Sequence, residues 1–251
     1  ERAIDGFISH CRTKRNSGGT INRKLAVLSK SLKLAHHWRI IGRVPGVRRQ
    51  KEGQNRIRFL TEEEEQQIIR HFKRLGLTDH LDAFVVFIDT GMRMSELWQL
   101  QSRDVNWSTG LLTLWETKSG KPRSIPMTGR AKRVLRRRLD DTGRLFDCDT
   151  RPDRMNDWYR QGWEKVRRAM RLEDDPHFVP YVTRHTCCSR LVQRGVDLMR
   201  VKTWIGHSSI QTTMRYAHLA PDALADLAFV LENGAQGCDA DVGDRHMRLG
   251  G

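Results

Sequence analysis

The chain has few cysteines and no long hydrophobic run, and both shortages narrow the kinds of protein it represents. The cysteines are odd in number and show no paired metal-ligand spacing, which disfavours a disulfide framework or a zinc site and favours a reducing compartment. The longest dense apolar run, residues 84–88, falls well short of the roughly 20 residues that a membrane span needs. No signal peptide is visible. The five cysteines are Cys11, Cys148, Cys187, Cys188 and Cys238.

Acidic side chains are also scarce relative to basic ones. The chain has 45 Lys and Arg residues against 30 Asp and Glu, which gives a net charge of +15 and a pI near 10.2. This balance favours an extended polyanion as the partner over a small acidic metabolite. A membrane surface is the competing partner, and the lack of a membrane span makes it the weaker interpretation.

The length of 251 residues is enough for one large domain or two smaller ones, and we favour two. The first residue is Glu1 rather than Met, and apolar residues already follow helical spacing from Ile4 onward. We therefore expect the chain to begin inside a larger natural protein.

The first part of the chain contains a basic amphipathic helix followed by a linker. Leu25, Leu28 and Leu32 form an apolar stripe, Thr20 is placed to cap the helix, and basic residues occupy the other faces. Residues 43–58 are short of large apolar side chains and contain Pro and Gly, which is typical of an exposed linker. The predicted divisions are a partial helical domain over 1–44, a basic linker over 45–59, a larger domain over 60–232 and a polar, disordered tail over 233–251.

The larger domain is predicted to be mainly α-helical with a small antiparallel β-sheet. Thr61 and Glu64 have the spacing of a capping box at the start of a helix, and Gly91 is placed to end another. Two short strand-like runs flank a Ser-Gly turn and predict a hairpin. The predicted elements include helices over 79–90, 184–194 and 222–231 and strands over 111–115 and 123–126.

Basic and nucleophilic residues recur in separate runs of this domain. Arg93 follows a glycine at a helix start, where backbone donors and a guanidinium can converge on one anion. Lys118 stands at the tip of the predicted hairpin, and Lys121 is its rival for the same task. Taken singly, such residues are more often solvated charges or packing residues. Their joint order instead favours a phosphate site with a nucleophile, made of Arg93, Lys118, Arg184, His207 and Tyr216, with Glu96 as a support for Arg93.

These runs resemble the tyrosine recombinase family, the phage-type integrases. They read TGMRMSEL, TKSGKPRSIP, TRHT and WIGHSSIQTTMRYAHL, and they follow the family's order over residues 60–219. The basic helix and linker before them resemble the end of the family's DNA core-binding domain. By position, the resemblance implies Arg93 and Arg184 as phosphate-clamping arginines, Glu96 as acidic support, Lys118 as the hairpin lysine, His207 as the second histidine and Tyr216 as the nucleophile.

One position departs from the family's pattern. The family usually has a histidine three residues before the second arginine, and this chain has Tyr181. A phenol can donate a hydrogen bond to a phosphate oxygen, but with a reference pKa of about 10 it exchanges protons poorly near neutrality. We interpret Tyr181 as a substitute that binds without acting as a base. His185 is one residue along the helix from Arg184 and is expected to point in another direction.

The resemblance implies a site-specific recombinase or integrase of a mobile element. A tyrosine nucleophile would leave a 3′-phosphotyrosyl intermediate, so neither a metal cofactor nor ATP is expected. Two alternatives remain: a type IB-like DNA topoisomerase and a DNA-binding relative that has lost catalysis. The expected partner is double-stranded DNA, bound by a homo-oligomer (a tetramer) in the cytoplasm, at the nucleoid. The predicted DNA-contacting residues outside the larger domain are Arg23, Lys24, Arg48, Arg49, Lys51 and Arg56.

Overall fold

The computed structural model describes residues 2–53, 57–115, 120–139, 143–147 and 152–221. It divides the chain into two compact units, Glu1–Arg56 and Ile57–Gly251. The division lies within the linker predicted over residues 45–59. Lys118, Arg56, and the helix and tail predicted after residue 221 fall outside the described residues.

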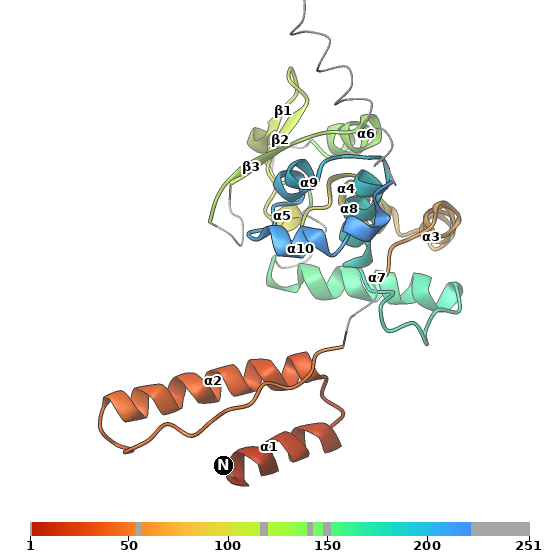
Figure 1. The fold of residues 1–251 in the computed structure, drawn as a ribbon. Helices are drawn as coiled ribbons and strands as arrows, with labels where there is room; N and C mark the ends of the chain where they lie inside the picture. The colour runs from red at the N-terminus through yellow and green to blue at the C-terminus, as the bar shows by residue number, and fades with distance from the viewer. Residues whose placement is uncertain (1, 54–56, 116–119, 140–142, 148–151, 222–251) are drawn as a thin grey trace, which may run out of the picture. The chain divides into compact units, whose positions relative to one another are not determined.

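The first unit contains two helices, α1 (Arg2–Thr13) and α2 (Gly18–His37), drawn in red and orange in Figure 1. Ile8, Cys11 and Ile21 are buried between them and form a small core. The side chain of Ser17, not the predicted Thr20, caps α2 by accepting a hydrogen bond from the Thr20 backbone N–H. The helix therefore begins three residues earlier than its apolar stripe suggests.

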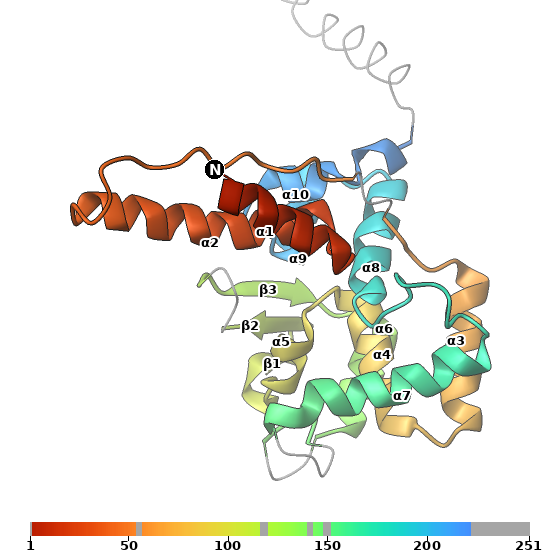
Figure 2. The same cartoon turned by 90° about the horizontal axis from the view of Figure 1, so that it is seen from below.

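The segment after α2 runs back along that helix (Figure 2). The Asn22 side chain accepts a hydrogen bond from the Gln50 backbone N–H at 2.7 Å and donates one to the Gln50 carbonyl at 2.9 Å. Val47 packs against the small core. Part of the stretch that composition predicts to be an exposed linker is thus anchored to α2, because the Asn22 side-chain amide hydrogen-bonds both backbone groups of Gln50.

The second unit is built around α4 (Thr78–Thr90), a largely buried helix that contacts α3, α6, α7 and α8. The predicted capping box begins α3, with Thr61 and Glu64 in reciprocal hydrogen bonds. Gly91 ends α4 in a left-handed conformation with φ of 64°, also as predicted. The other helices are α3 (Glu62–Arg74), α5 (Met94–Trp98), α6 (Gly129–Arg137), α7 (Met155–Ala169), α8 (Val182–Gln193), α9 (Leu198–Ile205) and α10 (Ile210–Met214), with short 3-10 turns η1 (Ser102–Asp104), η2 (Pro152–Arg154) and η3 (Ala217–Leu219).

A three-stranded antiparallel sheet lies beside the helices (Figures 1 and 2). Its order is β1 (Val105–Asn106), β2 (Leu111–Leu114) and β3 (Arg123–Pro126). The predicted hairpin pairs β2 with β3, and β3 also contacts α9. The predicted fold class, mainly α with a small antiparallel sheet, is confirmed.

Two hydrophobic clusters stabilise the second unit. The main one surrounds α4 and includes the fully buried rings of Phe84 and Trp163. The smaller one is formed by α8, α9 and the residues after α10, and it includes Cys188, Val201 and Tyr216. The first turn of α8 thus belongs to the main cluster, while the rest of the helix supports the segment that carries the predicted nucleophile.

Candidate active site

Arg184 lies in the first turn of α8 with only 2% of its surface exposed. Its Nη1 donates to the Gly91 carbonyl at 2.5 Å, while Nε and Nη2 are buried and have no hydrogen-bond partner among the described residues. Burial, followed by the charge of Arg93, lowers the pKa of Arg184. A buried cation with unpaired donors is costly unless an anion completes it, so this geometry is suited to binding an anion.

Glu96 holds the second arginine, Arg93, at the start of α5. The Glu96 carboxylate accepts from the Arg93 backbone N–H at 2.7 Å and from its Nη1 at 2.9 Å. The Arg93 Nη2 donates to the Gly206 carbonyl at 3.2 Å. Burial would raise the pKa of Glu96, but hydrogen bonds from Arg123 and the charges of Arg123 and Arg93 lower it overall. Glu96 is therefore an ionised support for the guanidinium.

Arg123 also binds Glu96, and the sequence motifs had not assigned it a role. Its Nη1 and Nη2 donate to the two oxygens of Glu96 at 2.9 and 2.8 Å. Its Nε donates to the Trp204 carbonyl at 3.3 Å. The predicted hairpin placed Arg123 on a strand, but nothing local in the sequence connects that strand to Glu96.

His207 follows Gly206, which ends α9 in a left-handed conformation. Its Nδ1 shares a hydrogen bond with the Thr213 hydroxyl at 2.9 Å. Burial, then the charges of Arg184 and Arg93, lowers the pKa of His207 to about 4. The imidazole is thus neutral at physiological pH and lies within the electrostatic range of both arginines.

Tyr216 follows α10, and only 3% of its surface is exposed. Its hydroxyl lies 2.5 Å from Nδ1 of His185, so the histidine that was expected to point elsewhere contacts the predicted nucleophile. His185 does diverge from Arg184 along the helix, but the chain returns after α10 and brings Tyr216 to it. Burial raises the pKa of Tyr216, and burial followed by the charge of Arg215 lowers the pKa of His185 to about 4.

Tyr181 stands immediately before α8, with 45% of its surface exposed. Its ring lies perpendicular to that of His185, with the centroids 5.0 Å apart. Electrostatic interactions also link Tyr181 to Arg184 and Tyr216. The predicted catalytic residues in the described part of the chain therefore gather in one region, formed by α5, the start of α8 and the segment from α9 to Tyr216.

A family model described as the phage integrase family matches residues 58–222, which span this whole region. The chain belongs to the phage integrase family. The resemblance seen in the sequence motifs is thereby confirmed.

Curated relatives carry recombinase and integrase names. The chain is 30% identical over 181 residues to tyrosine recombinase XerA of Pyrococcus furiosus, covering 69% of this chain and 63% of the relative. It is 30% identical over 228 residues to the integrase of Haemophilus phage HP1, covering 89% of this chain and 63% of the relative. The chain thus spans less than two thirds of the length of these relatives.

Solved structures share the fold. An integrase of the Tn1549 transposon, in complex with transposon right end DNA, matches with a TM-score of 0.75 at 19% identity, covering 92% of this chain and 84% of that one. The catalytic domain of bacteriophage HP1 integrase matches with a TM-score of 0.55 at 26% identity, covering 73% of this chain and all of that one.

The residues predicted to contact DNA in the first unit are exposed where the structure describes them. Arg23 and Lys24 lie on α2, and Arg48, Arg49 and Lys51 lie on the segment that runs back along it. Lys24 also contacts the Asn16 side chain at 3.4 Å. No helix within the described residues is long and apolar enough to cross a membrane.

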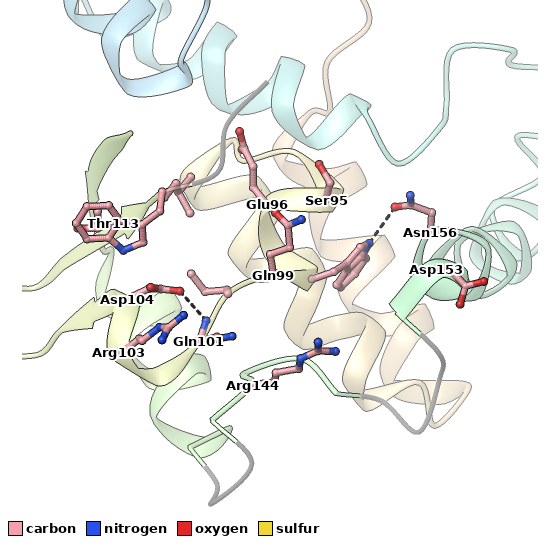
Figure 3. A pocket seen from close by; sticks show the side chains of 14 residues that line it. Ser95, Glu96, Gln99, Gln101, Arg103, Asp104, Thr113, Arg144, Asp153 and Asn156 are labelled. Atoms are coloured by element: carbon pink, nitrogen blue, oxygen red, sulfur yellow. Dashed lines mark hydrogen bonds between the residues drawn. The ribbon is translucent and has the colours of Figure 1, made fainter. Parts of the chain in front are cut away.

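A cavity of about 510 Å³ shares Glu96 with the site (Figure 3). Ser95 and Glu96 of α5 line it together with Gln99, which follows that helix, and Asn156 of α7 accepts from the Trp98 indole at 2.9 Å. Among the described residues that line this cavity, Glu96 is the one predicted site residue. Arg93, Arg184 and Tyr216 are not among the residues that line this cavity.

Proposed function

We propose that this phage integrase family protein is a site-specific DNA recombinase that cleaves and rejoins DNA strands through a 3′-phosphotyrosyl intermediate on Tyr216. The observation that carries the proposal is the buried guanidinium of Arg184, whose Nε and Nη2 have no partner in the part of the chain that the structure describes. A phosphodiester would supply the missing acceptors and the missing negative charge. The names of the curated relatives and the DNA complex of the Tn1549 integrase support DNA as the source of that phosphate.

In this mechanism, Arg184 and Arg93 bind the non-bridging oxygens of the scissile phosphate. Charge builds on these oxygens as the nucleophile attacks, and guanidiniums that stay protonated bind it through paired hydrogen bonds. The neutral His207 adds a hydrogen bond, and Glu96 keeps Arg93 in place. Tyr181 contributes a hydroxyl donor at the exposed edge of the site.

The nucleophile requires a base, because burial keeps the Tyr216 phenol protonated at neutral pH. His185 is placed to accept the proton: Nδ1 of its neutral ring lies 2.5 Å from the phenol oxygen, and the negative charge of a bound phosphate would raise the pKa of the imidazole from its lowered value. The Tyr216 oxygen bonds to phosphorus, the proton passes to Nδ1 of His185, and the bond from phosphorus to the 5′ oxygen breaks. This role replaces the base function that Tyr181 cannot perform.

The departing 5′ oxygen takes a proton from Lys118, the hairpin lysine. The phosphotyrosyl ester preserves the energy of the broken bond, so attack by another strand's 5′ hydroxyl rejoins the DNA without ATP. We further propose that the protein acts as a homo-oligomer, a tetramer, on double-stranded DNA at the nucleoid. Arg23, Lys24, Arg48, Arg49, Lys51 and Arg56 contact phosphates and supply affinity with little sequence information.

The experiment that tests this function begins with Tyr216→Phe. Duplexes enriched from a random pool by binding to this variant provide the substrate, which is then nicked beside the candidate cleavage position. The wild-type protein is expected to form a covalent adduct with the nicked duplex, and Tyr216→Phe is expected to bind with unchanged affinity and form none. An undiminished adduct in Tyr216→Phe would reject the assignment of the nucleophile, and no adduct in the wild type would reject strand transfer.

A further inference from the structure

Arg123 is engaged by the protein through every nitrogen of its guanidinium, unlike its neighbour Arg184. Nη1 and Nη2 grip both oxygens of Glu96, and Nε donates to the Trp204 carbonyl. The side chain is only 8% exposed. Each nitrogen of this guanidinium already donates to the protein, whereas two nitrogens of Arg184 do not, so the two arginines are suited to different roles.

The contacts of Arg123 join elements that are far apart in the sequence. Arg123 lies on β3, Glu96 on α5 and Trp204 near the end of α9. Trp204 in turn donates its indole N–H to the Thr90 carbonyl at 3.1 Å, at the end of α4. One side chain thus fastens the hairpin strand to the two turns from which Arg93 and His207 project.

Gly206 shows how closely Arg123 is seated against the end of α9. A Cβ atom at position 206 would lie 2.8 Å from Nη1 and 2.9 Å from Cζ of Arg123. The backbone here also has φ of 75°, which side-chain-bearing residues rarely adopt. The Gly206 carbonyl accepts from Arg93, so the same turn contacts both guanidiniums.

The charges around Glu96 also indicate that Arg123 affects how Arg93 is held. The Glu96 carboxylate forms salt bridges with two cations, Arg93 and Arg123. With both present, the cluster keeps a net positive charge that an incoming phosphate can use. Without Arg123, the full negative charge of Glu96 would act on Arg93 and hold it away from a phosphate.

We propose that Arg123 is a positioning residue for strand cleavage: it fixes β3 to the end of α9 through Glu96 and the Trp204 carbonyl, and so holds Arg93 and His207 at the phosphate site. The catalytic part of this inference rests on the proposed function. The positioning of a phosphate site does not, because it can be measured with inorganic phosphate alone.

The test compares Arg123→Lys and Arg123→Gln with the wild type in three measurements. These are affinity for the selected duplex, the single-turnover rate of adduct formation, and the affinity for inorganic phosphate read from its stabilising effect on thermal unfolding. Duplex affinity is expected to change by less than about threefold, because many other phosphate contacts carry it. Adduct formation is expected to slow about 100-fold and phosphate binding to weaken about tenfold, the scale for losing aligned donors.

The lysine variant separates geometry from charge. Lysine keeps the positive charge but cannot grip two carboxylate oxygens and a carbonyl together. Arg123→Lys is therefore expected to behave like Arg123→Gln. The matched control is Arg58→Lys, which removes a similar arrangement, a guanidinium bound to Glu64 and Asp175, elsewhere in the second unit. This control is expected to lose stability while keeping adduct formation and phosphate affinity.

Gly206→Ala disturbs the seat of Arg123 from the other side and should slow adduct formation while leaving duplex affinity intact. The proposal is overturned if folded Arg123→Lys forms adduct and binds phosphate within threefold of the wild type, or if Arg58→Lys shows the same defects. It is also overturned if duplex affinity falls in proportion to the cleavage rate. A wild type that forms no adduct but whose phosphate affinity drops in both Arg123 variants would reject the recombinase function and retain the positioning role.

Discussion

Replacing Arg184 with methionine should make the protein more stable while destroying its proposed activity. Methionine roughly fills the volume of the arginine stem without bringing a charge or donors into the interior. In the wild type, Nε and Nη2 are buried without partners, and each unsatisfied donor costs about 1–3 kcal/mol. The substitution removes both costs and gives up the bond from Nη1 to the Gly91 carbonyl, which contributes about 1.5–3 kcal/mol as a charged hydrogen bond.

At the midpoints of these ranges, about 4 kcal/mol is gained and about 2 kcal/mol is lost, so the free energy of unfolding should rise by about 2 kcal/mol. For a protein of this size, Tm should rise by about 2–4 °C for each kcal/mol. Urea unfolding and a thermal scan, both without DNA, measure the change. Inorganic phosphate should stabilise the wild type and leave Arg184→Met unaffected, because the variant has lost the anion site.

Arg123→Met is the matched control, since it removes a guanidinium of the same site whose nitrogens all have partners. It breaks a buried ion pair and leaves Glu96 with less compensation, so the free energy of unfolding should fall by about 3–5 kcal/mol. The distinctive outcome is that the free energy of unfolding rises in Arg184→Met and falls in Arg123→Met. The claim that Arg184 is a buried cation completed by an anion would be refuted if Arg184→Met lowered the free energy of unfolding, or if phosphate stabilised this variant as much as the wild type.

Three further outcomes are expected. His185 and His207 have pKa values lowered to about 4 from 6.5, so between these pH values the unfolded state binds protons that the folded state does not. The contribution to stability is therefore complete above pH 6.5 and falls towards pH 4, by about 2–3 kcal/mol per histidine. Combining His185→Asn with His207→Asn should flatten this pH dependence, as measured by urea unfolding. Gly91→Ala should lower the free energy of unfolding by about 2–4 kcal/mol, because the new Cβ would lie 2.6 Å from Ile205 Cδ1 on a backbone with φ of 64°. The control Gly195→Ala has a similar φ of 75° but open space around the new Cβ, so it should lower that free energy by only about 1 kcal/mol. Chemical unfolding measures both. Replacing Arg48 and Arg49 with neutral residues should reduce the steepness with which the logarithm of duplex affinity falls with the logarithm of salt concentration, by about 0.9 for each lost phosphate contact. Replacing Arg160 and Arg168, which are exposed on α7 and paired with acidic residues, should leave this slope unchanged.

Local signals in the sequence were sufficient for the elements whose causes are local. The capping box at Thr61, the left-handed Gly91 and the β2–β3 hairpin each depend on neighbours within a few residues, and all three predictions are confirmed. The cap of α2 was misassigned to Thr20 because Ser17, three residues earlier, has the same chemistry and the apolar stripe does not distinguish them.

Contacts between distant segments could not be predicted in the same way. Helical geometry correctly separates His185 from Arg184, but it carries no information about Tyr216, which arrives 31 residues later. The pairing of Arg123 with Glu96 likewise depends on how β3 meets α9. Motif order indicated which residues would gather, whereas the state of each donor, paired in Arg123 and unpaired in Arg184, required coordinates.

The two hydrophobic clusters of the second unit have a consequence for how this protein tolerates change. Tyr216 is buried in the smaller cluster with Cys188 and Val201, away from the aromatic residues around α4, and Trp204 packs against both. Substitutions in clusters that share few partners combine almost additively. The cost of a substitution around the tyrosine should therefore add to the cost of one around α4, except at Trp204 and where α8 packs against α4, so most positions of the two clusters are adjustable one at a time.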